Sequence, residues 1–400
     1  MAEFDRQPLD LSEISQRLQK HVEADAPDKL KMMAARGMLP APPEQMVKIL
    51  YQLHFDSDDK VSSAAHDSAA DMPPNVIGPA VQSVKHPGLL DWIGELHADS
   101  DEVGTVLVRN PATDDHTVAT LAEHAGDQLA DVIATNQVRV LRTPRIIESL
   151  YQNPSVSSAT IDSLIELAQR NDVELKGLPG LTEALKSGQQ FSSDGGIDEE
   201  TFSKLLREES SRANEHERKR AELEEKGDNL TRSQREKLQE ELESDDYDDN
   251  DPGDETDVDE LKKRGNLHAQ LNEMSISQKI RLATVGSREA IKILVRDQNK
   301  LVHMAAIKSP RIKQGDIKKM ASNKALPENV IEYIAGNRDW IQKYDVVRNL
   351  VLNPKTPLKD TMKFLKHLRM SDLRDVSRNR NVPHQVSRAA KSLMRKRRGG

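Results

Sequence analysis

Cysteine is absent from this chain of 400 residues, and Phe, Trp and Tyr together make up only 3% of it. Without cysteine, the chain cannot form disulfides or hold zinc or iron–sulfur clusters on thiolates. A large β-sandwich or an α/β enzyme usually has a core richer in aromatic residues. The composition, with 31% charged residues, therefore favours helices.

Long apolar runs and enzyme motifs are also missing. No stretch of 18 apolar residues occurs, and the charged start of the chain, MAEFDR, leads into no apolar segment. We therefore expect a cytoplasmic protein that does not insert into a membrane. The sequence contains no GxGxxG, P-loop, GxSxG or HExxH motif, and its histidines are dispersed. These absences predict a protein that is not an enzyme and has no metal site and no cofactor.

The charges that are present are divided along the chain. Residues 261–400 contain 32 Lys and Arg against 11 Asp and Glu, a net charge of +21, whereas the other residues carry a net charge of −29. Such a molecule either binds a polyanion with its basic part or masks that part with its own acidic segment.

An internal repeat is the second strong signal. Apolar residues at helical spacing lie on both sides of a dipeptide that ends in proline, so each copy predicts two helices with one buried face each. The first two copies are 43 residues apart and the last two 44, a spacing typical of HEAT-type solenoids. The four dipeptides are Asn110-Pro111, Asn153-Pro154, Ser309-Pro310 and Asn353-Pro354.

Capping explains these dipeptides best. Asn tolerates the left-handed conformation that often ends a helix, and the following Pro cannot continue that helix. In the clearest copy, Thr356 is expected to be the N-cap of the second helix, and Pro357 its first residue. The same register places Leu350 on the inner face of the first helix.

Composition changes between the repeats. Residues 194–260 hold 26 Asp and Glu and 10 Lys and Arg, with no continuous apolar face. We therefore predict an all-α protein with two short HEAT-like α-solenoid blocks joined by a charged linker, which is largely disordered or a solvated helix. The expected parts are an N-terminal block (1–188), an acidic linker (189–262) and a basic C-terminal block with a basic tail (263–400).

Several segments carry a family resemblance. The repeats resemble HEAT-like and leucine-rich-repeat-variant families, and residues 34–40, 135–141, 334–340 and 352–357 resemble a group of uncharacterised bacterial helical-repeat proteins. The resemblance covers residues 30–185 and 270–395, and it implies a helical-repeat fold in a bacterial protein but no activity. Some leucine-rich-repeat-variant proteins carry an iron–sulfur cluster on cysteines, which this chain lacks.

The leading functional interpretation is a non-enzymatic scaffold or adaptor that binds a protein partner along a helical-repeat surface. The alternative is a nucleic-acid-associated or other polyanion-binding protein that uses residues 263–400, which the acidic linker masks.

A third interpretation is an enzyme that acts on DNA bases. It would need a carboxylate in a basic groove, and Asp339 beside Trp340 is the only pair of interest for that role. Trp340 and Tyr344 are the aromatic stacking candidates of the basic block, with Phe364 assigned to the core, and so small a number argues against sequence-specific single-strand recognition. The candidate polyanion-binding residues are Arg378, Arg380, Arg388, Lys391, Arg395, Lys396, Arg397 and Arg398.

Overall fold

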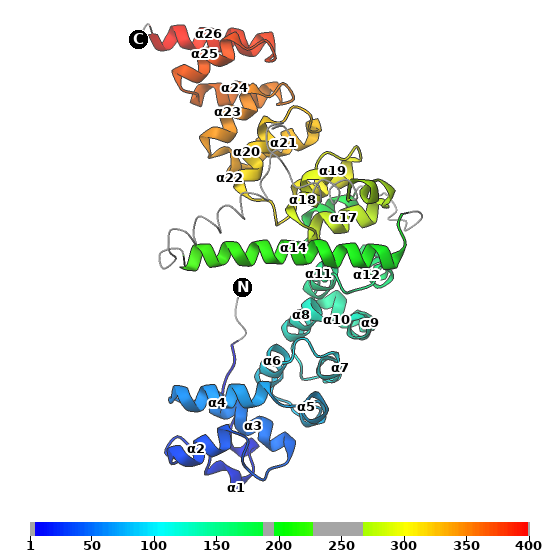
Figure 1. Cartoon of the computed structure of the whole chain (residues 1–400), viewed down its shortest axis with the longest axis vertical. Helices are drawn as coiled ribbons and strands as arrows, with labels where there is room; N and C mark the ends of the chain where they lie inside the picture. Colours follow the sequence, from blue (N-terminus) through cyan, green and yellow to red (C-terminus); the bar gives the residue numbers. More distant parts are fainter. Residues whose placement is uncertain (1–4, 187–195, 227–266, 399–400) are drawn as a thin grey trace, which may run out of the picture. The chain divides into compact units, whose positions relative to one another are not determined.

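The computed structural model describes residues 5–186, 196–226 and 267–398 (Figure 1). All regular secondary structure in these ranges is helical, which confirms the all-α prediction. The chain divides into two compact units, Met1–Gly177 and Leu178–Gly400, hereafter unit 1 and unit 2. Most of the expected linker, which is the segment predicted to mask the basic block, lies outside the described residues, and so does all of its C-terminal part, residues 243–260.

Unit 1 consists of short helices packed in two rows. The first row is α3, α5, α7 and α9, in which each helix contacts the next, and the second is α4, α6, α8 and α11. The helices of this unit are η1 Leu11–Glu13, α1 Gln16–Gln19, α2 Asp28–Ala35, α3 Pro43–His54, α4 Asp59–Ala70, α5 Pro74–Val81, α6 Pro87–Leu96, α7 Asp101–Arg109, α8 Asp115–His124, α9 Asp127–Thr135, α10 Gln137–Arg142, α11 Arg145–Gln152 and α12 Ser158–Arg170.

The buried stripes are those that the repeat pattern predicts. Helix α7 begins after Ser100, whose hydroxyl accepts a hydrogen bond from the amide of Val103. Val103 and Leu107 of α7 are fully buried, as are Val118 and Leu121 of α8. Each such side chain contributes about 1.5 to 3 kcal/mol by leaving water, so the core of these pairs stabilises helices that are too short to persist alone.

Unit 2 contains the other helices that the structure describes. Helices α17, α19 and α21 contact one another in order, α20 packs on α23, and α26 packs on both α24 and α25. Their bounds are α13 Pro179–Lys186, α14 Glu199–Lys226, α17 Ile276–Val285, α18 Arg288–Leu294, α19 Lys300–Ile307, α20 Gln314–Ser322, α21 Glu328–Gly336, α22 Arg338–Ile341, α23 Tyr344–Leu352, α24 Leu358–Phe364, η2 Leu365–His367, α25 Met370–Arg378 and α26 His384–Arg398.

Helix α14 differs from the solvated segment that the sequence predicts. Phe202, Leu206 and Ala213 are buried on one face, and the helix packs against α17. Glu209 lies in the middle of this face, between Leu206 and Ala213, so the sequence shows no continuous apolar stripe there. Its carboxylate is buried and accepts hydrogen bonds from the Ser287 hydroxyl and from the Arg212 guanidinium. The first half of α14 therefore belongs to the packed core of unit 2.

Helix α13 likewise packs within unit 2, whereas the sequence placed residues up to 188 in the first block. It contacts α19, and Gly180 allows the close approach, because a Cβ there would lie 2.7 Å from the Cα of Ala305. Among the residues that the structure describes, none of the helices combines the length and the apolar character needed to cross a membrane.

Candidate functional site

The repeat asparagines are buried and connect neighbouring helices. The Nδ2 of Asn353, at the end of α23, donates to the carbonyls of Ala321 (3.0 Å) and Asn323 (3.2 Å) at the end of α20. Its Oδ1 accepts from the amide of Lys355 at 3.1 Å. Two other copies repeat this arrangement: Asn110 donates to Val81 and Val84, and Asn153 donates to Ala122 and Ala125.

The conformation of these asparagines corrects the capping prediction. Asn110, Asn153 and Asn353 have φ values of −75°, −78° and −87° and an extended backbone, so none is left-handed. With this backbone, the side-chain amides of Asn110, Asn153 and Asn353 reach free carbonyls at the end of a helix about 30 residues earlier. The Ser309 side chain is shorter, accepts from the Arg311 amide and, in the described chain, reaches no preceding helix. The prolines that follow, Pro111, Pro154, Pro310 and Pro354, begin the turns after these helices.

Thr356 also has a different role from the predicted one. Its hydroxyl donates to the carbonyl of Leu350 at 2.6 Å and so gives a hydrogen-bond donor to one of the last carbonyls of α23. Pro357 is the N-cap residue of α24, which begins at Leu358.

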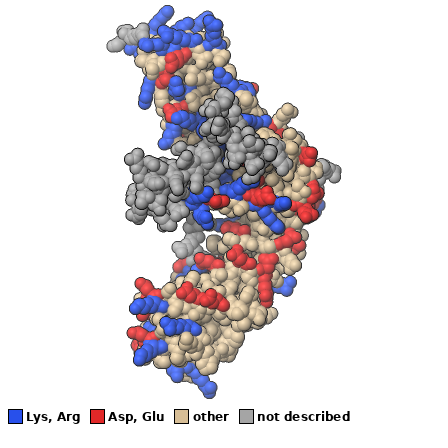
Figure 2. Space-filling view, viewed as in Figure 1, with Lys and Arg blue, Asp and Glu red and all other residues tan. Residues whose placement is uncertain are grey.

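The basic candidates lie in α25, in α26 and in the loop between them. Arg378 and Arg380 are exposed, and Arg388, Lys391 and Arg395 are exposed at spacing i, i+3, i+7 on one face of α26. Lys396 is exposed beside them, and the side chain of Arg398 lies outside the described residues. Figure 2 shows Lys and Arg gathered over these helices at the top of the view.

Arg397 differs from the other candidates, because its guanidinium bonds within the protein. It donates to the carbonyls of Lys366 and Leu368, each at 2.6 Å, where η2 ends. This is the arrangement that the repeat asparagines make, here with an arginine on the last helix. A cation at a helical C-terminus is also favoured by the helix dipole.

The aromatic side chains of the basic block are already in contact with protein groups. Trp340 packs edge-on against Tyr333, with ring centroids 5.7 Å apart, and Asp339 beside it is exposed. The Tyr344 hydroxyl bonds to Asp372, and Arg369 lies 4.6 Å above its ring. Burial and the bond to Asp372 raise the pKa of Tyr344. Both rings therefore already pack against groups of unit 2.

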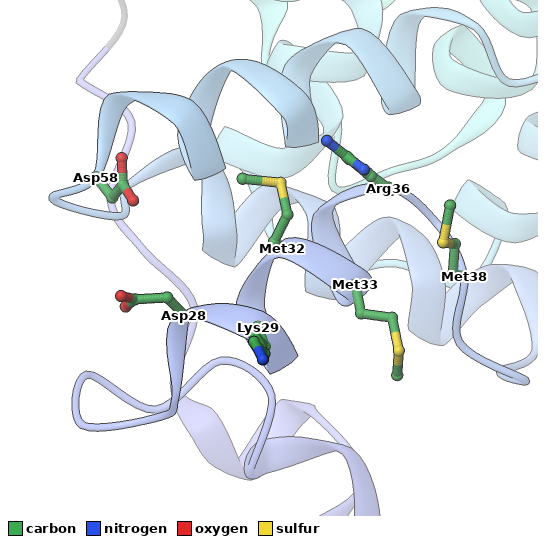
Figure 3. A pocket seen from close by; sticks show the side chains of 7 residues that line it. All are labelled: Asp28, Lys29, Met32, Met33, Arg36, Met38 and Asp58. Carbon is green, nitrogen blue, oxygen red and sulfur yellow. The ribbon is translucent and has the colours of Figure 1, made fainter.

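A cavity in unit 1 was not predicted from the sequence. It has a volume of about 410 Å³ and lies between α2 and the start of α4 (Figure 3). Met38 and Met33, which are 63% and 39% exposed, lie toward one end, and the carboxylates of Asp28 and Asp58 lie at the other. The full lining is Asp28, Lys29, Met32, Met33, Arg36, Met38 and Asp58. The only signal in the sequence is the cluster of methionines at positions 32, 33 and 38.

The described residues do not form a cluster of three or more His, Asp or Glu side chains able to hold a metal ion. The chain matches no protein-family model, no curated protein and no solved structure.

Proposed function

We propose that the chain is a non-enzymatic adaptor that binds a protein partner through the methionine-lined cavity of unit 1. The two rows of short helices and the 43-residue period support placing the repeats with the HEAT-like solenoids. Proteins of this architecture stack similar units, and the resulting extended surfaces commonly serve as binding sites.

The exposed methionines carry the proposal. Exposure of large apolar side chains such as Met33 and Met38 to water is unfavourable, and an apolar patch with a polar rim is typical of a protein-interaction site. Methionine is unbranched and polarisable, so it can adapt its shape to a partner. The charged lining residues Asp28, Lys29, Arg36 and Asp58 place both signs of charge around the methionines. Charges at a rim chiefly orient a partner, whereas the apolar centre supplies the affinity.

Affinity capture from a nuclease-treated bacterial lysate tests this function. We expect the combined change Met33→Glu and Met38→Glu to reduce the captured partner at least about tenfold, the equivalent of about 1.4 kcal/mol, because carboxylates would be desolvated in the apolar centre. The matched control is Val138→Glu on α10, which changes a residue that is 78% exposed and remote from the cavity lining. Equal capture by the two variants and the unchanged chain would contradict the proposal.

A further inference from the structure

We infer that the outer surface of α25 and α26 binds the phosphate backbone of duplex nucleic acid without reading its sequence. This inference goes beyond the adaptor function, because it concerns unit 2 and a different class of partner. The α25–α26 basic surface is defined by seven exposed side chains: Arg374, Arg378, Arg380, Arg388, Lys391, Arg395 and Lys396.

The positive charge of this surface is not neutralised by neighbouring carboxylates. Asp375 is the only exposed acidic residue described in α25, α26 and their connecting loop. Asp372 is buried and accepts hydrogen bonds from Tyr344 and Arg348. None of the seven cations forms an ion pair with a described residue. A field of one sign over adjacent helices attracts polyanions and speeds their association.

The composition of the surface favours nucleic acid over an acidic protein. The exposed large hydrophobic residues of the described chain include Leu358 and Met362 of α24, but none from α25 or α26. A protein interface needs a centre that is apolar and depleted in charged residues. Protein–nucleic acid interfaces are more polar and far more positively charged. The α25–α26 basic surface therefore resembles a nucleic-acid interface more than a protein interface.

The lack of aromatic side chains in this surface favours a duplex over a single strand. Single-strand binding depends on bases stacking on aromatic side chains, and residues 365–398 contain no Phe, Tyr or Trp. Arg388 and Arg395 are seven residues apart on one helical face, a rise of about 10 Å. Along that distance one DNA strand carries about three phosphates, so Arg388, Lys391 and Arg395 together match a short run of backbone. Contacts of this kind position a protein but carry no sequence information.

The test uses the full chain and a short labelled duplex, titrated between about 50 and 200 mM salt. The variant combines Arg388→Gln, Lys391→Gln and Arg395→Gln. It removes three positive charges from one face of α26 and keeps the hydrogen bonds of Arg397 to the carbonyls of Lys366 and Leu368. The control combines Lys300→Gln, Lys324→Gln and Lys343→Gln, which removes the same charge from exposed positions of unit 2 outside the surface. Circular dichroism should show the same helix content for all three proteins.

We expect the surface variant to bind the duplex more weakly and to lower the slope of log K against log salt by about 3, because each removed cation leaves one phosphate without its partner. The control should keep the slope of the unchanged chain, and two duplexes of unrelated sequence should bind equally.

The inference is overturned by an equal effect of both variants or by no binding at the lowest salt. Tighter binding of poly-glutamate than of the duplex would identify an acidic protein as the partner, and tighter binding of a single strand would also overturn it. The cavity variants of unit 1 should not change these titrations, so the two proposals can fail separately.

Discussion

Leu350→Asp should unfold unit 2. Leu350 is completely buried in α23, which packs on α20. An unpaired carboxylate in that position costs several kcal/mol, comparable with the roughly 5 to 15 kcal/mol that holds a domain together. Circular dichroism of the full chain should therefore show reduced helix content at room temperature, and the decrease should correspond to the helices of unit 2. This is the largest effect that we expect from a single substitution.

Leu358→Asp provides the matched control. Leu358 is 43% exposed at the first position of α24, where an acidic side chain interacts favourably with the helix dipole. We expect its free energy of unfolding to stay within about 0.5 kcal/mol of the unchanged chain, as is usual for surface positions. If Leu350→Asp melts like Leu358→Asp, the assignment of Leu350 to the core is wrong.

Asn353→Ala should destabilise unit 2 by about 2 to 4 kcal/mol, because it removes the bonds from Nδ2 to the α20 carbonyls and leaves buried acceptors unsatisfied. The comparison is with Asn379→Ala. Asn379 ends α25 with the same extended backbone, and its Oδ1 bonds to the Asn381 amide as the Asn353 Oδ1 bonds to Lys355. No bond from the described Asn379 side chain crosses to a preceding helix.

Urea denaturation of the two variants measures this difference. Asn379→Ala should cost about 1 kcal/mol, the usual net value of one hydrogen bond. A similar decrease in stability in both variants would contradict this expectation. It would mean that the asparagine stabilises the protein through the bond from its Oδ1 to the amide two residues later, and not through its bonds to another helix. A clearly larger decrease in Asn353→Ala than in Asn379→Ala would establish that the repeat asparagines connect one helix pair to the next.

The sequence by itself determined the class of fold and the register of its helices. The stripes that contain Val103, Leu107 and Leu350 follow the helical period, and the dipeptides such as Asn353-Pro354 mark where the first helix of each pair ends. These features depend on residues a few positions apart, so a local pattern contains them. The positions of the basic residues in α26 were predictable for the same reason.

Only the tertiary structure decided what the polar side chains contact. The Asn353 amide donates to carbonyls about 30 residues earlier, and Glu209 of α14 accepts a hydrogen bond from Ser287, the N-cap residue of α18, which lies 78 residues later. Arg397 likewise bonds to carbonyls within the protein, whereas Arg395 of the same helix makes no such bond in the described chain. The partner of a hydrogen bond, or the burial of a helix face, depends on which distant segment packs beside it. Periodicity shows that a face exists, but the packing of the other helices decides whether that face is covered.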